Sequence, residues 1–138
     1  MKHPHSALLF FACLAASPVK AAEEAIDFAR QIKPIIADRC VECHNSESLT
    51  GNLNLQSRHL AMQKRKEGPV IVPGKPEKSL LYLTLTLPVK DRKAMPATAH
   101  RLPKSDIETV RLWIKQGAPW PEGKEGEIAP RKFKTKAG

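Results

Sequence analysis

Aromatic residues, cysteines and strand-like runs are all scarce in this chain of 138 residues. Aromatic side chains make up 5% of the residues, so the chain has little of the large apolar surface that usually dominates a core. One cysteine lies at position 13, and the other two, Cys40 and Cys43, form a single pair. A zinc site usually needs about four ligands, and no second cysteine pair exists to complete one. The scarcity of strand-like runs argues against the βαβ setting of a thioredoxin-like redox pair.

The chain also has no apolar run near its start of the roughly 20 residues that a transmembrane helix requires. Residues 7–16 are uncharged and mostly apolar; Lys2 precedes them and Val19-Lys20-Ala21 follows. A charged start, a short apolar stretch and small residues before a cut are the three parts of a secretory signal peptide. We therefore expect residues 1–21 to be a signal peptide and the protein to be periplasmic. A lipid anchor on Cys13 is a minor alternative.

The pentapeptide Cys40-Val41-Glu42-Cys43-His44 is the most informative motif. C-x-x-C-H is the attachment signature of a c-type haem, in which the two thiols bind the porphyrin and the histidine binds iron. A redox-active thiol pair, half of a zinc site and a disulfide are the alternatives. A disulfide here would close a tiny loop and stabilise the fold little. We therefore expect one haem c per chain, attached through Cys40 and Cys43, with His44 as the proximal iron ligand.

A second iron ligand is expected in the polar, proline-containing loop between residues 87 and 105. Met95 lies in this loop and is followed by Pro96, which favours an extended backbone at the residue before it. A c-type haem bound by histidine on one face often takes a methionine sulfur on the other. Met95 is thus the predicted distal ligand, and His59 and His100 are the competing candidates.

Helices dominate the expected secondary structure. The apolar spacing predicts them over about residues 25–40, 58–66, 76–85 and 105–116. Pro34 should kink or divide the first helix, and Ser57 could cap the second. Ser105 and Glu108 have the spacing of a capping box at the start of the last helix, and Gly117 should end it.

This pattern predicts a small all-α domain over residues 22–120. Apolar stripes at residues 28–36 and 107–114 suit a contact between the first and last helices. Residues 121–138 are rich in Pro, Gly, Lys and Glu, and we expect them to form a basic, mobile tail.

The chain resembles the planctomycete-type cytochrome c domain. Beyond Ile35 and the pentapeptide, the matching residues are Gly51-Asn52-Leu53-Asn54-Leu55, the block 68–81, Met95-Pro96, Leu102 and the block 112–121. The resemblance implies a small cytochrome c fold of about four helices around one covalently attached haem, with the N- and C-terminal helices crossing. It also implies that Cys40 and Cys43 carry the thioethers, and that His44 and Met95 are the axial ligands. The family loop more usually reads Met-Pro-Pro, and here Ala97 replaces the second proline.

The function expected is therefore single-electron transfer by an exported, free-standing monohaem carrier, with no substrate-turnover site. Apolar residues should line the haem pocket and tune its potential; the candidates are Val70, Ile71, Leu81, Leu85 and Leu102. The alternatives are a haem-based sensor or accessory subunit with a displaceable sixth ligand, and a haem-free binding module whose cysteines form a disulfide.

The formal net charge of +9 points to an acidic redox partner, because complementary charge raises encounter rates. Lys90, Arg92 and Lys93 cluster just before Met95. They are expected either to dock that partner or to pair with a haem propionate, with a solvated basic loop as the alternative. The basic residues are otherwise scattered without an aromatic-basic face, which argues against nucleic acid.

Overall fold

The computed structural model describes residues 23–130, and within them every regular element is a helix or a helical turn. A π-helical turn at Phe28–Ile32 leads into α1 at Lys33–Arg39, and α2 is a single turn at Arg58–Ala61. Helix α3 spans Leu80–Thr86 and α4 spans Lys104–Lys115. Short 3-10 turns occur at Thr50–Asn52, Pro76–Lys78 and Gly123–Glu125. The all-α prediction is confirmed for the part of the chain that is described.

Pro34 divides the first helix, as predicted. Proline lacks the N–H that would continue the α-helical ladder, and the chain passes this position by changing hydrogen-bond pattern. The backbone N–H of Lys33 bonds to the carbonyl of Phe28, five residues earlier. Asp27 caps the π-helical turn by accepting a hydrogen bond from the N–H of Arg30 at 2.9 Å. The buried residues of the π-helical turn are Phe28 and Ile32, and the buried residue of α1 is Ile36.

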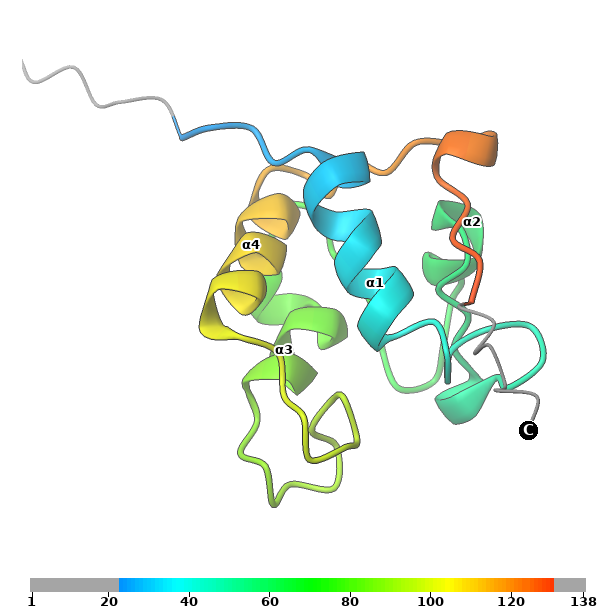
Figure 1. Ribbon diagram of the computed structural model, residues 1–138, viewed down its shortest axis with the longest axis vertical. Coiled ribbons are helices and arrows are strands. Elements are labelled where there is room, and N and C mark those ends of the chain that lie inside the picture. Colours follow the sequence, from blue (N-terminus) through cyan, green and yellow to red (C-terminus); the bar gives the residue numbers. More distant parts are fainter. Residues whose placement is uncertain (1–22, 131–138) are drawn as a thin grey trace, which may run out of the picture.

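Helix α4 carries the other half of the core and packs beside this N-terminal helix and α3 (Figure 1). Its buried face is Val110, Trp113 and Ile114. The contact to the N-terminal helix is made by the π-helical turn, where the Phe28 and Trp113 rings lie 6.2 Å apart. The two predicted apolar stripes therefore meet, while the crossing of the helices that the family implies stays a prediction.

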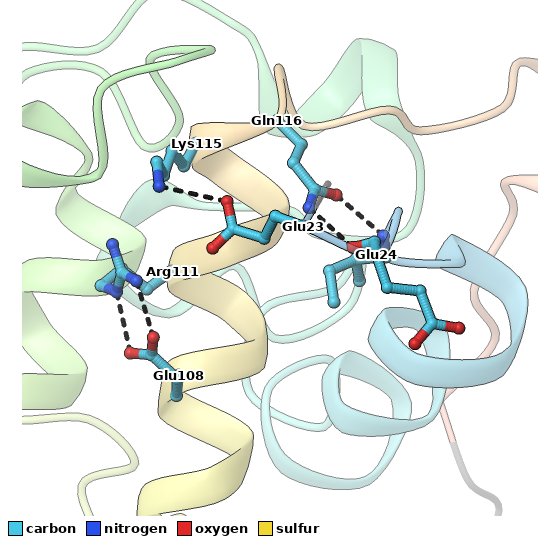
Figure 2. A network of polar contacts seen from close by, with 7 residues as sticks. Glu23, Glu24, Glu108, Arg111, Lys115 and Gln116 are labelled. Atoms are coloured by element: carbon cyan, nitrogen blue, oxygen red, sulfur yellow. Dashed lines mark hydrogen bonds and ion pairs between the residues drawn. The ribbon is translucent and has the colours of Figure 1, made fainter. Parts of the chain in front are cut away.

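Polar contacts hold the N-terminal segment to the end of α4 (Figure 2). The side chain of Gln116 accepts from the N–H of Ile26 at 2.8 Å and donates to the carbonyl of Glu24 at 2.9 Å. Lys115 pairs with Glu23 at 3.1 Å. The backbone amide of residue 26 thus has a partner where the chain enters the domain, as buried backbone groups require.

The C-terminal end of α4 follows its prediction and the N-terminal end does not. Gly117, at φ +98°, donates to Ile114, and Ala118 donates to Trp113, which is the Schellman pattern that terminates helices. The predicted capping box is wrong, because the helix begins at Lys104 behind Pro103 without a side-chain cap. Glu108 instead pairs with Arg111 at 2.6 Å, and the resulting hydrogen bond lowers the pKa of Glu108.

Two further helix predictions need correction. The second helix ends at Ala61 and not at residue 66, because the chain turns there and brings Arg65 inward to the carbonyl of Gly51. The third is divided into a 3-10 turn and α3 by Ser79, whose backbone is extended and whose side chain is fully buried. The Ser79 hydroxyl accepts from the N–H of Val72 and donates to the carbonyl of Lys75, each at 2.9 Å. These bonds hold the loop 68–75 against the start of α3.

The beginning of the predicted tail is packed against the domain. Ile128 is 2% exposed, and its N–H donates to the carbonyl of Gln56 at 2.7 Å. The Trp120 indole donates to the carbonyl of Gly126 at 2.8 Å, and the Trp120 ring stacks 5.0 Å from Phe28. Residues 121–130 thus contribute one buried apolar side chain, Ile128, to the core, while the mobility expected of the tail stays a prediction. Residues 131–138 and the predicted signal peptide lie outside the described residues.

Gly126 offers a direct test of this packing. A Cβ atom at this position would lie 1.8 Å from the carbonyl oxygen of Pro121, so Gly126→Ala must displace backbone. We expect a loss of about 2 kcal/mol or more in the free energy of unfolding, measured by urea titration followed by far-ultraviolet circular dichroism. Gly123→Ala is the control, because an added Cβ there would meet no neighbouring atom and only the positive φ disfavours a side chain. This variant should lose only about 1 kcal/mol in the free energy of unfolding. Equal losses in the two variants would contradict the packing described.

Candidate haem site

The pentapeptide Cys40–His44 forms a tight turn directly after α1. The N–H groups of Cys43 and His44 both bond to the carbonyl of Cys40, at 3.2 and 3.1 Å. Residues three and four apart in such a helical turn lie on one face. These backbone bonds give Cys40, Cys43 and His44 the spacing of one helical turn, which is the spacing that thioether attachment and iron binding would use. Val41, between the cysteines, is fully buried and anchors the turn in the core.

The imidazole of His44 is oriented by a backbone carbonyl. Its Nδ1 lies 2.8 Å from the carbonyl oxygen of Thr50. A carbonyl can only accept, so Nδ1 carries the proton and the lone pair is on Nε2. This is the arrangement in which metal-binding histidines are usually held, with the second ring nitrogen fixed by a hydrogen bond. His44 is half-buried.

The charge state of His44 also suits a ligand. Burial, the largest cause, and the nearby Arg65 cation lower the pKa of His44, against the opposite effect of the Thr50 carbonyl. Since the ordinary value is 6.5, the ring is neutral at physiological pH. Only the neutral ring has a lone pair for iron, so no bound proton has to be displaced.

Asn45 locks the loop that follows the motif. It is 5% exposed, and its amide nitrogen donates to the carbonyls of Val41 and Glu42 at 2.8 and 2.9 Å. Its amide oxygen accepts from the N–H groups of Glu47 and Ser48 at 2.8 and 2.9 Å. All the hydrogen-bonding capacity of the side chain is thus satisfied. Sequence reasoning missed this residue, although Asn commonly bonds to its own backbone in turns.

The two cysteines are free thiols with different surroundings: Cys43 is exposed and Cys40 is half-buried against the core. Burial raises the pKa of Cys40 to about 12. In a thioredoxin-like pair the attacking thiol has a lowered pKa. The raised pKa of Cys40 therefore argues against a redox-active thiol pair. Within residues 23–130 no group of three or more His, Cys, Asp or Glu side chains could hold a metal ion.

Met95 lies in a loop that is tied to α3. Its N–H donates to the carbonyl of Thr84 at 3.0 Å, and its side chain is half-buried. The Arg101 guanidinium contacts the carbonyl oxygens of both segments: it donates to Leu85 at 2.9 Å and to Pro96 at 3.3 Å. A cation at the C-terminal end of a helix also interacts favourably with the helix dipole. Sequence reasoning missed Arg101 because its partners come from tertiary structure.

The other predicted site residues fall into three groups. The apolar candidates belong to one core cluster, against which Cys40 packs; they are Val70, Ile71, Leu81, Leu85 and Leu102. His59 and His100, the competing ligands, are exposed. Lys90, Arg92 and Lys93 are also exposed, beside Val89, which is 68% exposed.

Two open surface grooves in the described part of the chain lie away from these ligands. One runs between α1 and the start of α4, and the other borders Trp120. Neither is lined by Cys40, Cys43, His44 or Met95. The fit of a haem therefore rests on the donor set: paired thiols, a neutral imidazole with its iron-binding nitrogen free, and a thioether on a fixed loop. This donor set is the one that a c-type haem with histidine and methionine ligands uses.

Comparison with known proteins agrees with this chemistry. The family model described as Planctomycete cytochrome C matches residues 40–97, a segment that begins at the first cysteine and ends two residues beyond Met95. No curated protein and no solved structure matches the chain. The block 112–121, which we also assigned to the resemblance, lies outside the matched segment. The match confirms the resemblance seen in the sequence over residues 40–97.

Proposed function

We propose that this protein is an exported, periplasmic carrier that transfers single electrons through one covalently bound haem c. The cytochrome c segment supports haem binding and electron transfer. The observation that carries the finer proposal is the hydrogen bond from His44 Nδ1–H to the Thr50 carbonyl, which leaves the lone pair of the ring on Nε2. When bound, the haem iron supplies the one-electron couple.

Each residue of the site has a separate role in this proposal. Cys40 and Cys43 tether the porphyrin edge, and His44 binds iron from the proximal side. The Thr50 carbonyl makes the His44 ring a stronger donor by accepting from Nδ1. Met95 is proposed as the distal ligand, held at its backbone by Thr84. If His44 and Met95 both held the iron, the site would bind neither oxygen nor substrate and would supply electron transfer alone.

The core around Cys40 has two proposed effects. Val70, Ile71, Leu81, Leu85 and Leu102 are each at most 9% exposed, so water is excluded on their side of the site. A low local dielectric penalises the additional charge of ferric iron, and the potential rises accordingly.

None of the helices described is long and apolar enough to cross a membrane.

An acidic redox protein is the proposed partner. Lys90, Arg92 and Lys93 are exposed on the loop that carries Met95, with the apolar Val89 beside them. A basic surface with an apolar contact point fits a transient electron-transfer encounter steered by charge. Ala94, between Lys93 and Met95, is 4% exposed. Its burial anchors the loop between the basic residues and Met95.

Reversible electron transfer is the first expected outcome. The full chain, produced with a c-haem maturation system, should show sharp visible bands on reduction that disappear on reoxidation. Carbon monoxide should not alter the reduced spectrum, because Met95 stays bound. The Cys40→Ser/Cys43→Ser double variant is the control and should lack the bands. Rapid carbon monoxide binding to the wild type would favour a sensor with a displaceable ligand over a carrier.

Removal of the distal ligand is the second test. Met95→Ala should abolish the weak ferric charge-transfer band of a methionine–iron bond and permit carbon monoxide binding. Met62→Ala is the matched control, because Met62 is 37% exposed at the end of α2 and should leave the band unchanged. A band that survives Met95→Ala but is lost in Met62→Ala would assign the sulfur ligand to Met62. A wild-type protein that lacks the band, and whose spectrum changes in His59→Ala or His100→Ala, would reassign the sixth ligand to that histidine.

A further inference from the structure

Arg65 is a buried cation in the segment that leads away from α2. Its side chain is 10% exposed, and its Nη2 donates to the carbonyl of Gly51. Its nearest acid, Glu67, lies 3.4 Å away and is itself 58% exposed. An Arg side chain is rarely buried to this extent unless a well-placed partner compensates its charge.

One donor of this guanidinium has no acceptor. The Nε atom of Arg65 is the single buried side-chain nitrogen or oxygen in residues 23–130 for which no hydrogen-bond partner is found. Leaving a buried donor unpaired costs about 1–3 kcal/mol, and more when the group is charged. A cofactor that is added to the folded chain can supply the missing acceptor.

The position of Arg65 narrows the choice of acceptor. Gly51, which holds Arg65, directly follows Thr50, whose carbonyl orients His44. Arg65 therefore lies next to the proximal side of the proposed haem. The edge of a haem is apolar apart from its propionate carboxylates, which are the acceptors that a guanidinium pairs with best.

Other cations in the region are less suited to this role. Lys90, Arg92 and Lys93, which the sequence offered as propionate partners, are exposed to solvent. Arg101 is half-buried, but its terminal nitrogens are already bonded to the carbonyls of residues 84, 85, 87 and 96. Arg65 combines burial with an unused donor.

We propose that the Nε–H of Arg65 donates a hydrogen bond to a propionate carboxylate of the bound haem. Arg65 then closes the site behind His44 and neutralises one of the two acidic groups that the cofactor brings into the fold. This inference rests on the proposed haem function, which it deepens by assigning a cofactor-binding residue outside the C-x-x-C-H motif and the Met95 loop.

Nuclear magnetic resonance of the reduced, diamagnetic holoprotein tests the contact directly. We expect a slowly exchanging Arg65 Nε–H with a nuclear Overhauser contact to a propionate methylene group. Glu67→Gln should leave both signals in place, because Glu67 is not the acceptor. A rapidly exchanging Nε–H without that contact, or one that changes with Glu67→Gln, would overturn the proposal in favour of water or Glu67.

The reduction potential provides a second readout. Arg65→Gln leaves the propionate charge unpaired, which favours ferric iron; we expect the ferric-to-ferrous ratio at a fixed potential to rise about tenfold, a fall of about 59 mV for one electron. Arg65→Lys keeps the charge and should recover most of this shift. Arg58→Gln is the matched charge-loss control, since Arg58 is 43% exposed and pairs with Glu122, and it should change the ratio less than about twofold.

Haem content is recorded in the same samples, so a failure of the proposed electron-transfer function can be distinguished from a failure of the Arg65–propionate contact. A wild-type protein without haem would remove both the function and this contact. A haem-loaded protein whose potential is the same in Arg65→Gln and wild type, or shifts equally in Arg58→Gln, would refute the role of Arg65 and leave electron transfer standing.

Discussion

The 2.8 Å hydrogen bond between His44 Nδ1 and the Thr50 carbonyl determines which nitrogen of the ring can bind iron. Several other contacts serve to keep this pair in place. The N–H of Thr50 bonds to the carbonyl of Cys43, and the N–H of Leu55 bonds to the carbonyl of His44. Asn45 fills the turn between them with four further hydrogen bonds. Residues 40–55 therefore form one connected unit that fixes Cys40, Cys43 and His44 relative to one another, which is the preorganisation that the proposed haem site would require.

The rest of the domain supports this unit from two directions. The Phe28, Trp113 and Trp120 rings, 5.0 to 6.2 Å apart, concentrate the few aromatic side chains where the N-terminal helix, α4 and the C-terminal segment meet. Aromatic pairs at such distances stabilise a core beyond their buried area. On the other side, Arg101 ties the end of α3 to the Met95 loop. A chain poor in aromatic residues thus uses them at one end of the core, and a haem would supply apolar surface at the other.

Much of the fold was accessible from sequence because it depends on local chemistry. The apolar stripes, the division at Pro34 and the termination at Gly117 follow from periodicity and backbone rules, and the structure confirms them. The failures have tertiary causes. Ser105 and Glu108 have capping-box spacing, but the N-cap residue is Pro103, two positions before Ser105, and Glu108 pairs with Arg111. The composition of residues 121–130 predicts a tail, and it gives no sign that Ile128 is buried in the core. Arg65 and Arg101 appear in the sequence as two of many scattered cations, and only their buried partners, or the lack of one, distinguish them.

The central claim is that Cys40 and Cys43 hold one haem covalently, above the imidazole that Thr50 orients. Intact-mass spectrometry under denaturing conditions tests it most directly, because a thioether-bound haem stays with an unfolded chain and a non-covalent one is lost. For the full chain expressed with c-haem maturation, the account predicts the mass of residues 22–138 plus one haem. A chain that carries no added mass under these conditions would contradict it.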